Sequence, residues 1–293
     1  MERAELQRRA QDLFSLASPC RICPHICGTA RNEGALGKCG SGMKVAVSSD
    51  NLHFGEEPCL VGTGGSGTIF LTGCNLRCCF CQNYPISQIK HGKVVGGEWL
   101  ANAMLRLQGE GAVNINFVSP THWTAQIVEA IALARDNGLA IPFVWNCGGY
   151  ESIEALKLLE GIIDIFLPDA KYSDDALAVE LSGAPNYAEV NKLAICEMWR
   201  QVGKLEVSNG VATRGLLVRH LVLPGYLDNT RGVLEFLAGV DKDIAVSVMC
   251  QYFPAHKAQD LNGMNRRLSR GEWKQVKEWV SELGISEGYM QQL

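Results

Sequence analysis

Six short apolar runs, each followed by a helix-like pattern, constrain the fold of this chain more than any other feature. The runs are rich in β-branched and aromatic residues, and several are apolar almost without interruption, which is typical of parallel strands covered on both faces. They span residues 67–73, 112–119, 141–146, 162–168, 215–225 and 243–249. Several of the helical segments between them end at a glycine, a common C-terminal stop signal. This alternation predicts right-handed βαβ units around a parallel sheet.

Six such units are fewer than the eight of a complete barrel. The sequence therefore predicts an α/β fold built as a partial (β/α)6 barrel, with a doubly wound sheet as the alternative. Residues 56–265 are assigned to this barrel, residues 1–55 to a cysteine-rich N-terminal extension, and residues 266–293 to a C-terminal helix. The tail carries an apolar stripe that predicts packing against the barrel, formed by Trp273, Val276, Trp279 and Val280.

Charge and hydropathy predict where the protein acts. The formal charge of −4, from 27 basic and 31 acidic residues, gives no net positive field for nucleic acid or an anionic membrane. The first residues are charged and amphipathic, without the apolar core of a secretory signal. No apolar run approaches the roughly 20 residues that span a bilayer. We therefore expect a cytoplasmic protein with no membrane or nucleic-acid partner.

The chain has 12 cysteines, which in the absence of an export signal indicate metal ligation or catalysis in preference to disulfides. Two groups stand out along the sequence, one at positions 20–39 and one at positions 74–81. The scattered remainder are expected to be buried small hydrophobes, namely Cys59, Cys147, Cys196 and Cys250.

The second group follows directly on the first predicted strand, at the end that carries the chemistry in barrel-like α/β folds. Cys74, Cys78 and Cys81 are separated by three and two residues, a spacing that suits three corners of a [4Fe–4S] cluster. No fourth cysteine follows at ferredoxin spacing, so one iron would remain open to another ligand. Cys79 breaks the spacing and is expected to be a neighbour of the ligands. Structural zinc is the competing interpretation, but it usually draws paired cysteines from separated positions.

This spacing, with Phe80 directly before the last cysteine, resembles the radical S-adenosylmethionine (SAM) superfamily. The run "FGEEPCLVGTGGSGTIFLTGCNLRCCFCQN", with "NINFVSPTH", "GGYES", "LPDAKY", "VRHLVLPG" and "QYFPAHK", is similar to proteins grouped with pyruvate formate-lyase-activating enzyme. The similarity is strongest to a branch with an N-terminal cysteine block, and it covers residues 18–265.

The resemblance implies a mechanism and a set of cofactors. The open iron would bind the amino and carboxylate groups of SAM, and an electron donor of the flavodoxin or ferredoxin class would reduce the cluster. Reductive cleavage of SAM would then release a 5′-deoxyadenosyl radical that abstracts a hydrogen atom. Two substrates remain open: a backbone glycine of a partner glycyl-radical enzyme, and a small molecule or peptide. An Fe–S or zinc binding module without catalysis is the alternative of another class, and the barrel-like frame and the open-iron spacing argue against it.

Cofactor contacts are predicted at the carboxyl ends of the strands. Gly148 and Gly149 would let the backbone approach a ligand closely, and Lys171 of the family's Asp-x-Lys stretch would pair with the cofactor carboxylate. The full predicted set is Phe80, Ser119, Thr121, Asn146, Gly148, Gly149, Asp169 and Lys171. Each of these predictions has a purely structural alternative. Ser119 and Thr121 would belong to a helix N-cap, and residues 146–149 would form an ordinary βα turn. Asp169 and Lys171 would form a surface ion pair.

Two histidines are candidate catalytic residues. Arg219 and His220 lie in the fifth predicted strand and alternate in direction, so at most one of them faces the pocket. His256 follows the sixth predicted strand and would face the substrate or the cofactor. A purely structural role is the more common one for a lone histidine.

The N-terminal group consists of four cysteines at metal-ligand spacing, Cys20, Cys23, Cys27 and Cys39. They predict a small site for zinc, a single iron or an auxiliary Fe–S cluster, with His25 as a possible replacement ligand. Coincidental free thiols are the alternative. A second Fe–S cluster would relay electrons or bind substrate, whereas zinc would only hold the segment together.

Overall fold

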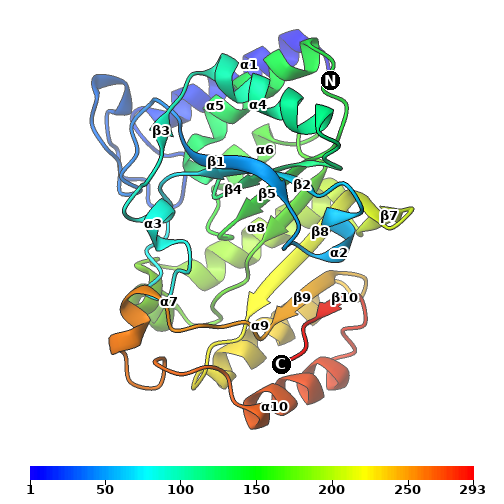
Figure 1. Cartoon of the computed structure of the whole chain (residues 1–293). Helices are drawn as coiled ribbons and strands as arrows, with labels where there is room; N and C mark the ends of the chain where they lie inside the picture. The colour runs from blue at the N-terminus through cyan, green and yellow to red at the C-terminus, as the bar shows by residue number, and fades with distance from the viewer.

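A computed structural model describes residues 1–293 as an α/β fold around one sheet (Figure 1). The strand order is β10-β9-β8-β6-β5-β4-β2-β1-β3, with β7 paired to β8. The strands are β1 (Ala46–His53), β2 (Ser66–Leu71), β3 (Lys93–Val94), β4 (Ile115–Val118), β5 (Phe143–Cys147), β6 (Ile165–Pro168), β7 (Glu206–Ser208), β8 (Val211–Leu221), β9 (Ala245–Met249) and β10 (Gly288–Met290).

The six predicted strands correspond to β2, β4, β5, β6, β8 and β9. They lie side by side in chain order, and every neighbouring pair among them is parallel. In a doubly wound sheet the order of the strands reverses at a switch point. Here the order of the six strands does not reverse, so the partial-barrel expectation is confirmed over its alternative. The continuous apolar runs are explained by burial on both faces, as in β6, where all four residues are buried.

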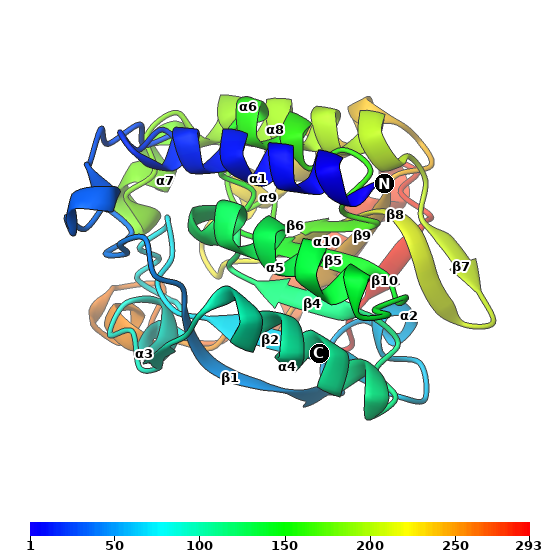
Figure 2. The same ribbon diagram turned by 90° about the horizontal axis from the view of Figure 1, so that it is seen from above.

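Helices cover one side of the sheet, where α4, α5, α1, α6 and α8 follow one another (Figure 2). The helices are α1 (Arg3–Ala17), α2 (Pro58–Val61), α3 (Tyr84–Ser87), α4 (Gly97–Gly109), α5 (Thr124–Asp136), α6 (Ile153–Leu158), α7 (Asp175–Ser182), α8 (Tyr187–Val202), α9 (Leu227–Val240) and α10 (Arg270–Glu282). None of them is both long and apolar enough to cross a lipid bilayer.

The N-terminal stretch contributes both to the helix layer and to the sheet. Helix α1 packs on α5 and α6, and β1 extends the sheet by antiparallel pairing with β2. Between them the chain is anchored by Arg31, whose side chain is only 1% exposed. Its guanidinium donates to the carbonyl oxygens of Gly42 and His122 and lies 5.5 Å from the ring centre of Trp123. The cysteine segment is therefore fixed against the start of α5.

The C-terminal helix α10 packs on α9 and buries Trp273, Val276 and Val280, as its apolar stripe predicts. Ser269 and Glu272 close its N-terminus with a reciprocal capping box. Beyond this helix, β10 adds a parallel edge strand to β9.

Candidate functional site

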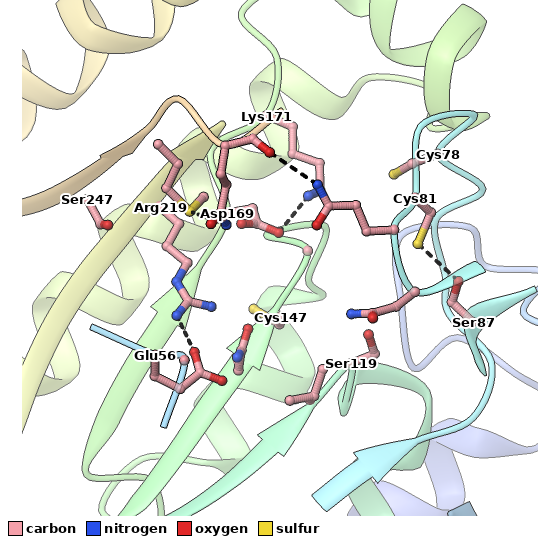
Figure 3. A pocket seen from close by; sticks show the side chains of 18 of the residues that line it. Glu56, Cys78, Cys81, Ser87, Ser119, Cys147, Asp169, Lys171, Arg219 and Ser247 are labelled. Atoms are coloured by element: carbon pink, nitrogen blue, oxygen red, sulfur yellow. Dashed lines mark hydrogen bonds and ion pairs between the residues drawn. The ribbon is translucent and has the colours of Figure 1, made fainter. Parts of the chain in front are cut away.

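A cavity of about 630 Å³ opens at the carboxyl ends of β2, β4, β5 and β6 and extends to β8, β9 and β10 (Figure 3). In parallel α/β folds this is the edge where ligands bind. Its wall contains many of the residues predicted from the sequence: Cys74, Cys78, Cys81, Ser119, Asn146, Gly148, Asp169 and Lys171.

The cysteine loop that follows β2 is held in place by the end of α7. The backbone N–H groups of Arg77 and Cys79 donate to the carbonyl oxygens of Ser182 and Leu181, at 2.9 and 2.8 Å. These bonds also satisfy carbonyl groups at the C-terminus of the helix. With the backbone fixed in this way, the three predicted ligands line the cavity, whereas Cys79 does not.

Each of the three sulfur atoms has a polar neighbour within the protein. Leu76 N–H donates to Cys74 Sγ (3.3 Å), Ser182 Oγ donates to Cys78 Sγ (3.0 Å), and Cys81 Sγ lies 3.2 Å from Ser87 Oγ. Burial raises the pKa of the Cys74 thiol to about 12 and that of Cys78 to about 11. Such thiols ionise at neutral pH only when a strong positive charge such as a metal centre binds them.

The donor set consists of thiols alone, the ligand type that Fe–S clusters share with structural zinc. No three His, Cys, Asp or Glu side chains in the structure are gathered as they would be around a single metal ion. Four thiolates on one zinc, at Zn–S distances of about 2.3 Å, would lie about 3.8 Å apart. A cubane cluster bonds each thiolate to a different iron, and it accepts ligands spread more widely along a cavity wall.

A lysine completes the polar face beside these thiols. Lys171 Nζ donates to Asp169 Oδ2 at 2.6 Å, and its side chain is 17% exposed. Burial disfavours its charged form, but the charges of Asp169 and Cys78 outweigh burial and raise the pKa of Lys171. Both residues lie in the cavity wall, on the same side as the cysteines.

Ser119 and Asn146 lie next to each other on the cavity wall, joined by a backbone hydrogen bond of 2.9 Å from Ser119 N–H to Asn146 O. Ser119 has φ of 57°, a left-handed conformation that costs energy for a serine and is often found at binding sites. Gly148 also lines the cavity. Gly149 instead serves packing, because a Cβ at this position would lie 2.0 Å from the carbonyl oxygen of Asp169.

Three other predicted residues lie away from this cavity. Phe80 is buried beside Tyr252, with ring centres 6.1 Å apart. Thr121 is buried and donates to the carboxylate of Glu151. His220 is fully buried, and its ring nitrogens lie 2.6 Å from Ala170 O and 3.0 Å from Thr230 Oγ1.

Arg219, the neighbour of His220 in β8, is the one that faces the cavity. His256 lines a second, adjacent cavity, where its ring stacks on Tyr84 with centres 4.7 Å apart. The two cavities share Gln82 and Gln251 in their walls.

The far end of the main cavity holds an ion cluster that sequence reasoning missed. Arg219 donates to both Glu56 and Glu57, and all three side chains are at most 14% exposed. Burial opposes ionisation of Glu57, but hydrogen bonds from Arg219 outweigh burial and lower the pKa of this carboxyl. The signal in the sequence is the pair of adjacent carboxylates just before Pro58, but nothing there indicates the arginine 162 residues later.

The N-terminal cysteines are also near one another. A Cβ on Gly37 would lie 3.5 Å from the sulfur atoms of both Cys27 and Cys39. Gly28 N–H donates to the carbonyl oxygen of Cys20 at 2.9 Å, which places Cys20 beside Cys27, and both Cys20 and Cys23 are buried. Of the four scattered cysteines, Cys59, Cys147 and Cys250 are buried as expected, whereas Cys196 is exposed on α8 because its position faces away from the sheet.

Glu151, which follows β5, gives the protein a pH-dependent stability. Its side chain is 4% exposed, and burial raises the pKa of its carboxyl to about 7, although the hydrogen bond from Thr121 partly offsets burial. The ordinary pKa of this carboxyl is 4.5. At pH values between 4.5 and about 7 the folded protein therefore holds the proton of Glu151 more tightly than the unfolded chain does. Its contribution to stability is therefore lost as the pH rises through this window.

We expect Glu151→Gln to match the wild type near pH 4 and to be more stable by about 3 kcal/mol near pH 8.5, measured by denaturant unfolding. The matched control is Glu154→Gln, since Glu154 is exposed and pairs with Arg21 on the surface. A stability difference between Glu151→Gln and wild type that does not change with pH would contradict the assignment of this carboxyl.

Known proteins are similar to this chain in fold and in sequence. No family model matches the chain. The structure is similar to that of SuiB from Streptococcus suis bound to S-adenosylmethionine, with a TM-score of 0.51, 10% identity, and coverage of 75% of this chain and 48% of SuiB. At this identity the likeness concerns the fold alone, and the chain spans about half the length of SuiB.

Two archaeal proteins are similar in sequence. The chain is 23% identical over 266 residues to the uncharacterized protein MJ0808 of Methanocaldococcus jannaschii, covering 83% of this chain and 72% of that protein. It is 31% identical over 278 residues to the uncharacterized protein MJ0674 of the same organism, covering 91% of this chain and 75% of that protein. At this identity and coverage, the chain belongs to the same protein family as MJ0674.

Proposed function

We propose that this protein is a radical SAM enzyme whose [4Fe–4S] cluster is held by Cys74, Cys78 and Cys81. The observation that carries the proposal is that three closely spaced thiols line one wall of a cavity that also holds a buried lysine. A fold similar to that of a protein solved with SAM supports it. When bound, the cluster and SAM would supply one-electron cleavage of a sulfonium bond and a carbon radical that abstracts hydrogen.

The residues of this chain have distinct roles in the proposal. The three thiolates bind iron, and the hydrogen bonds to their sulfur atoms tune the reduction potential. Lys171 offers a fixed positive charge to the carboxylate of SAM, and Asp169 holds that charge in position. Ser119 and Asn146 present polar groups to the rest of the cofactor.

The cavity has room beyond the cofactor. Its volume of about 630 Å³ lies within the usual range for small-molecule sites. The group that loses hydrogen would occupy the part of the cavity that the cofactor leaves free. The narrower proposal, suggested by the resemblance to pyruvate formate-lyase-activating enzyme, is that this group is a backbone glycine of a partner enzyme. A small molecule or a peptide is the alternative.

The proposal is tested by anaerobic incubation of the reconstituted protein with dithionite and SAM. We expect 5′-deoxyadenosine and methionine to form in equal amounts, detected by mass spectrometry. Failure to form either product from a protein that contains iron and sulfide would refute the proposed function. A persistent glycine-centred EPR doublet on adding a glycyl-radical enzyme would identify an activase, and its absence with all such partners from the same cell would refute the narrower proposal.

A further inference from the structure

We propose that the N-terminal cysteines, Cys20, Cys23, Cys27 and Cys39, hold a second Fe–S cluster through which electrons reach the cluster in the cavity. The metal site follows from the geometry of this segment itself. The electron-transfer role rests in addition on the function proposed above.

The main chain of this segment folds back so that its cysteines lie together. Gly28 N–H donates to the carbonyl oxygen of Cys20 at 2.9 Å, which places Cys20 beside Cys27. Ile26 N–H donates to the carbonyl oxygen of Cys23 at 3.0 Å, so Cys23 lies in the same bend. Three thiols are thus gathered in one short loop, as in a metal-binding segment.

The fourth cysteine is brought to the same place by a turn at Gly37. Cys27 Sγ accepts a hydrogen bond from Thr29 Oγ1 at 3.3 Å. A Cβ at Gly37 would be in contact with the sulfur atoms of both Cys27 and Cys39. Two of the thiols are buried, and the two at the turn are half-buried, so one side of the site is open to a partner.

The N-terminal cysteine segment is docked directly on the loop that carries Cys74, Cys78 and Cys81 (Figure 1). His25 Nε2 donates to the carbonyl oxygen of Asn75 at 2.7 Å, and Arg77 Nη2 donates to that of Lys38 at 2.6 Å. Asn75 and Arg77 both lie between Cys74 and Cys78, while Lys38 directly precedes Cys39. The two cysteine groups are thus joined by hydrogen bonds between residues adjacent to the ligands.

Gly73 shows how close this approach is. It has φ of +80°, and a Cβ at this position would lie 3.2 Å from the carbonyl oxygen of Cys39 and 2.7 Å from Ser41 Oγ. Gly73 directly precedes Cys74 in the chain. The backbone of Cys39, a candidate ligand of the second cluster, is therefore packed against the neighbour of Cys74, a candidate ligand of the first. Electron tunnelling slows steeply with distance, so this close approach of the two segments favours transfer between clusters held by them.

The electron balance is simple. A flavodoxin-class donor would give one electron to a cluster held by the N-terminal cysteines, and this electron would pass to a cluster held by the cavity cysteines. The sulfonium of SAM would accept it as its C5′–S bond breaks, which gives methionine and the 5′-deoxyadenosyl radical. No proton or group transfer is needed along the way. A zinc site in the same place would accept no electron.

The test uses full-length protein reconstituted anaerobically, and it compares the wild type with Cys39→Ala and with Cys196→Ala, which changes an exposed thiol on α8. We expect about eight irons and eight sulfides per chain in the wild type and in the control, and about four of each in Cys39→Ala. Cys27→Ala, at the other half-buried position, is expected to reproduce this loss. Circular dichroism melts verify that each variant is folded.

The same proteins are then assayed for SAM cleavage with two reductants. In Cys39→Ala the rate with reduced flavodoxin is expected to fall at least about tenfold, while the rate with dithionite, which reduces the cavity cluster directly, stays within about threefold. Stoichiometric zinc in the wild type, or an unchanged iron content in both variants, would overturn the second cluster. An equal loss with both reductants would show that the site is structural.

One further outcome separates the two proposals. A wild type that holds about eight irons but cleaves no SAM with dithionite would refute the proposed function and leave the second cluster supported.

Discussion

Replacement of Cys78 by alanine is expected to abolish SAM cleavage, with a loss of at least about 10³-fold, because two thiolates do not retain a cubane with one open iron. Cys78 is the middle ligand of the loop, and its sulfur accepts a hydrogen bond from Ser182. The measurement is 5′-deoxyadenosine formation with dithionite, alongside the iron content of the variant. Cleavage within tenfold of wild type would contradict the ligand assignment.

The matched control is Cys79→Ala, one position along the same loop. Cys79 is buried to a similar degree but does not line the cavity. Its replacement removes one small apolar group, so we expect a stability loss of about 1 kcal/mol and nearly full activity. If both variants lose iron equally, the loop depends on both thiols for its structure, and the distinction between ligand and neighbour fails.

Arg219→Met is expected to destabilise the protein by about 3–5 kcal/mol, the largest stability effect we anticipate for a single residue of the cavity. The variant leaves Glu56 and Glu57 adjacent and unpaired, with each carboxylate side chain only 7% exposed. Removing one partner of a buried ion cluster costs the full desolvation of the charges that remain. The measurement is the free energy of unfolding in urea near neutral pH.

Two further variants make this result specific. Arg214→Met lies on the same strand, but Arg214 is exposed and bonds only a carbonyl oxygen, so a change below about 0.5 kcal/mol is expected. The triple variant Arg219→Met/Glu56→Gln/Glu57→Gln removes the stranded charges and should recover most of the loss. A triple variant as unstable as Arg219→Met alone would show that packing of the arginine stem, and not charge, is what matters.

The central sheet was predictable because its strands are buried on both faces. Each of the six parallel strands leaves a largely apolar run in the sequence, and their order follows the chain. The outer strands leave no such signal. Strand β1, "AVSSDNLH", is half exposed and polar, and β10 has only three residues.

The hairpin of β7 and β8 has a local signal in the sequence, the dipeptide Asn209-Gly210. Asn209 and Gly210 both have positive φ, at 50° and 80°, as expected for the Asn-Gly turn between antiparallel strands. Strand β8 consequently begins at Val211, four residues before the predicted start of that run.

The candidate site was predictable where its residues follow a strand directly. Cys74, Ser119 and Asp169 lie just after the ends of parallel strands and Asn146 lies near the end of β5, so the fold brings all four to one edge. Contacts between distant segments could not be predicted in this way. The pairing of Arg219 with Glu56, and the docking of residues 20–42 on the cysteine loop, depend on tertiary packing that no local pattern encodes.

The most direct test of the central claim, that three cysteines hold a cluster with an open iron that SAM binds, is EPR of the reduced protein with and without SAM. The Cys39→Ala variant is the best sample, since it should contain the cavity cluster alone. We expect a reduced-cluster signal from about one spin per chain that changes shape when SAM is added, and that is missing in a Cys39→Ala/Cys78→Ala variant. A signal from a four-iron cluster that SAM leaves unchanged would contradict the account.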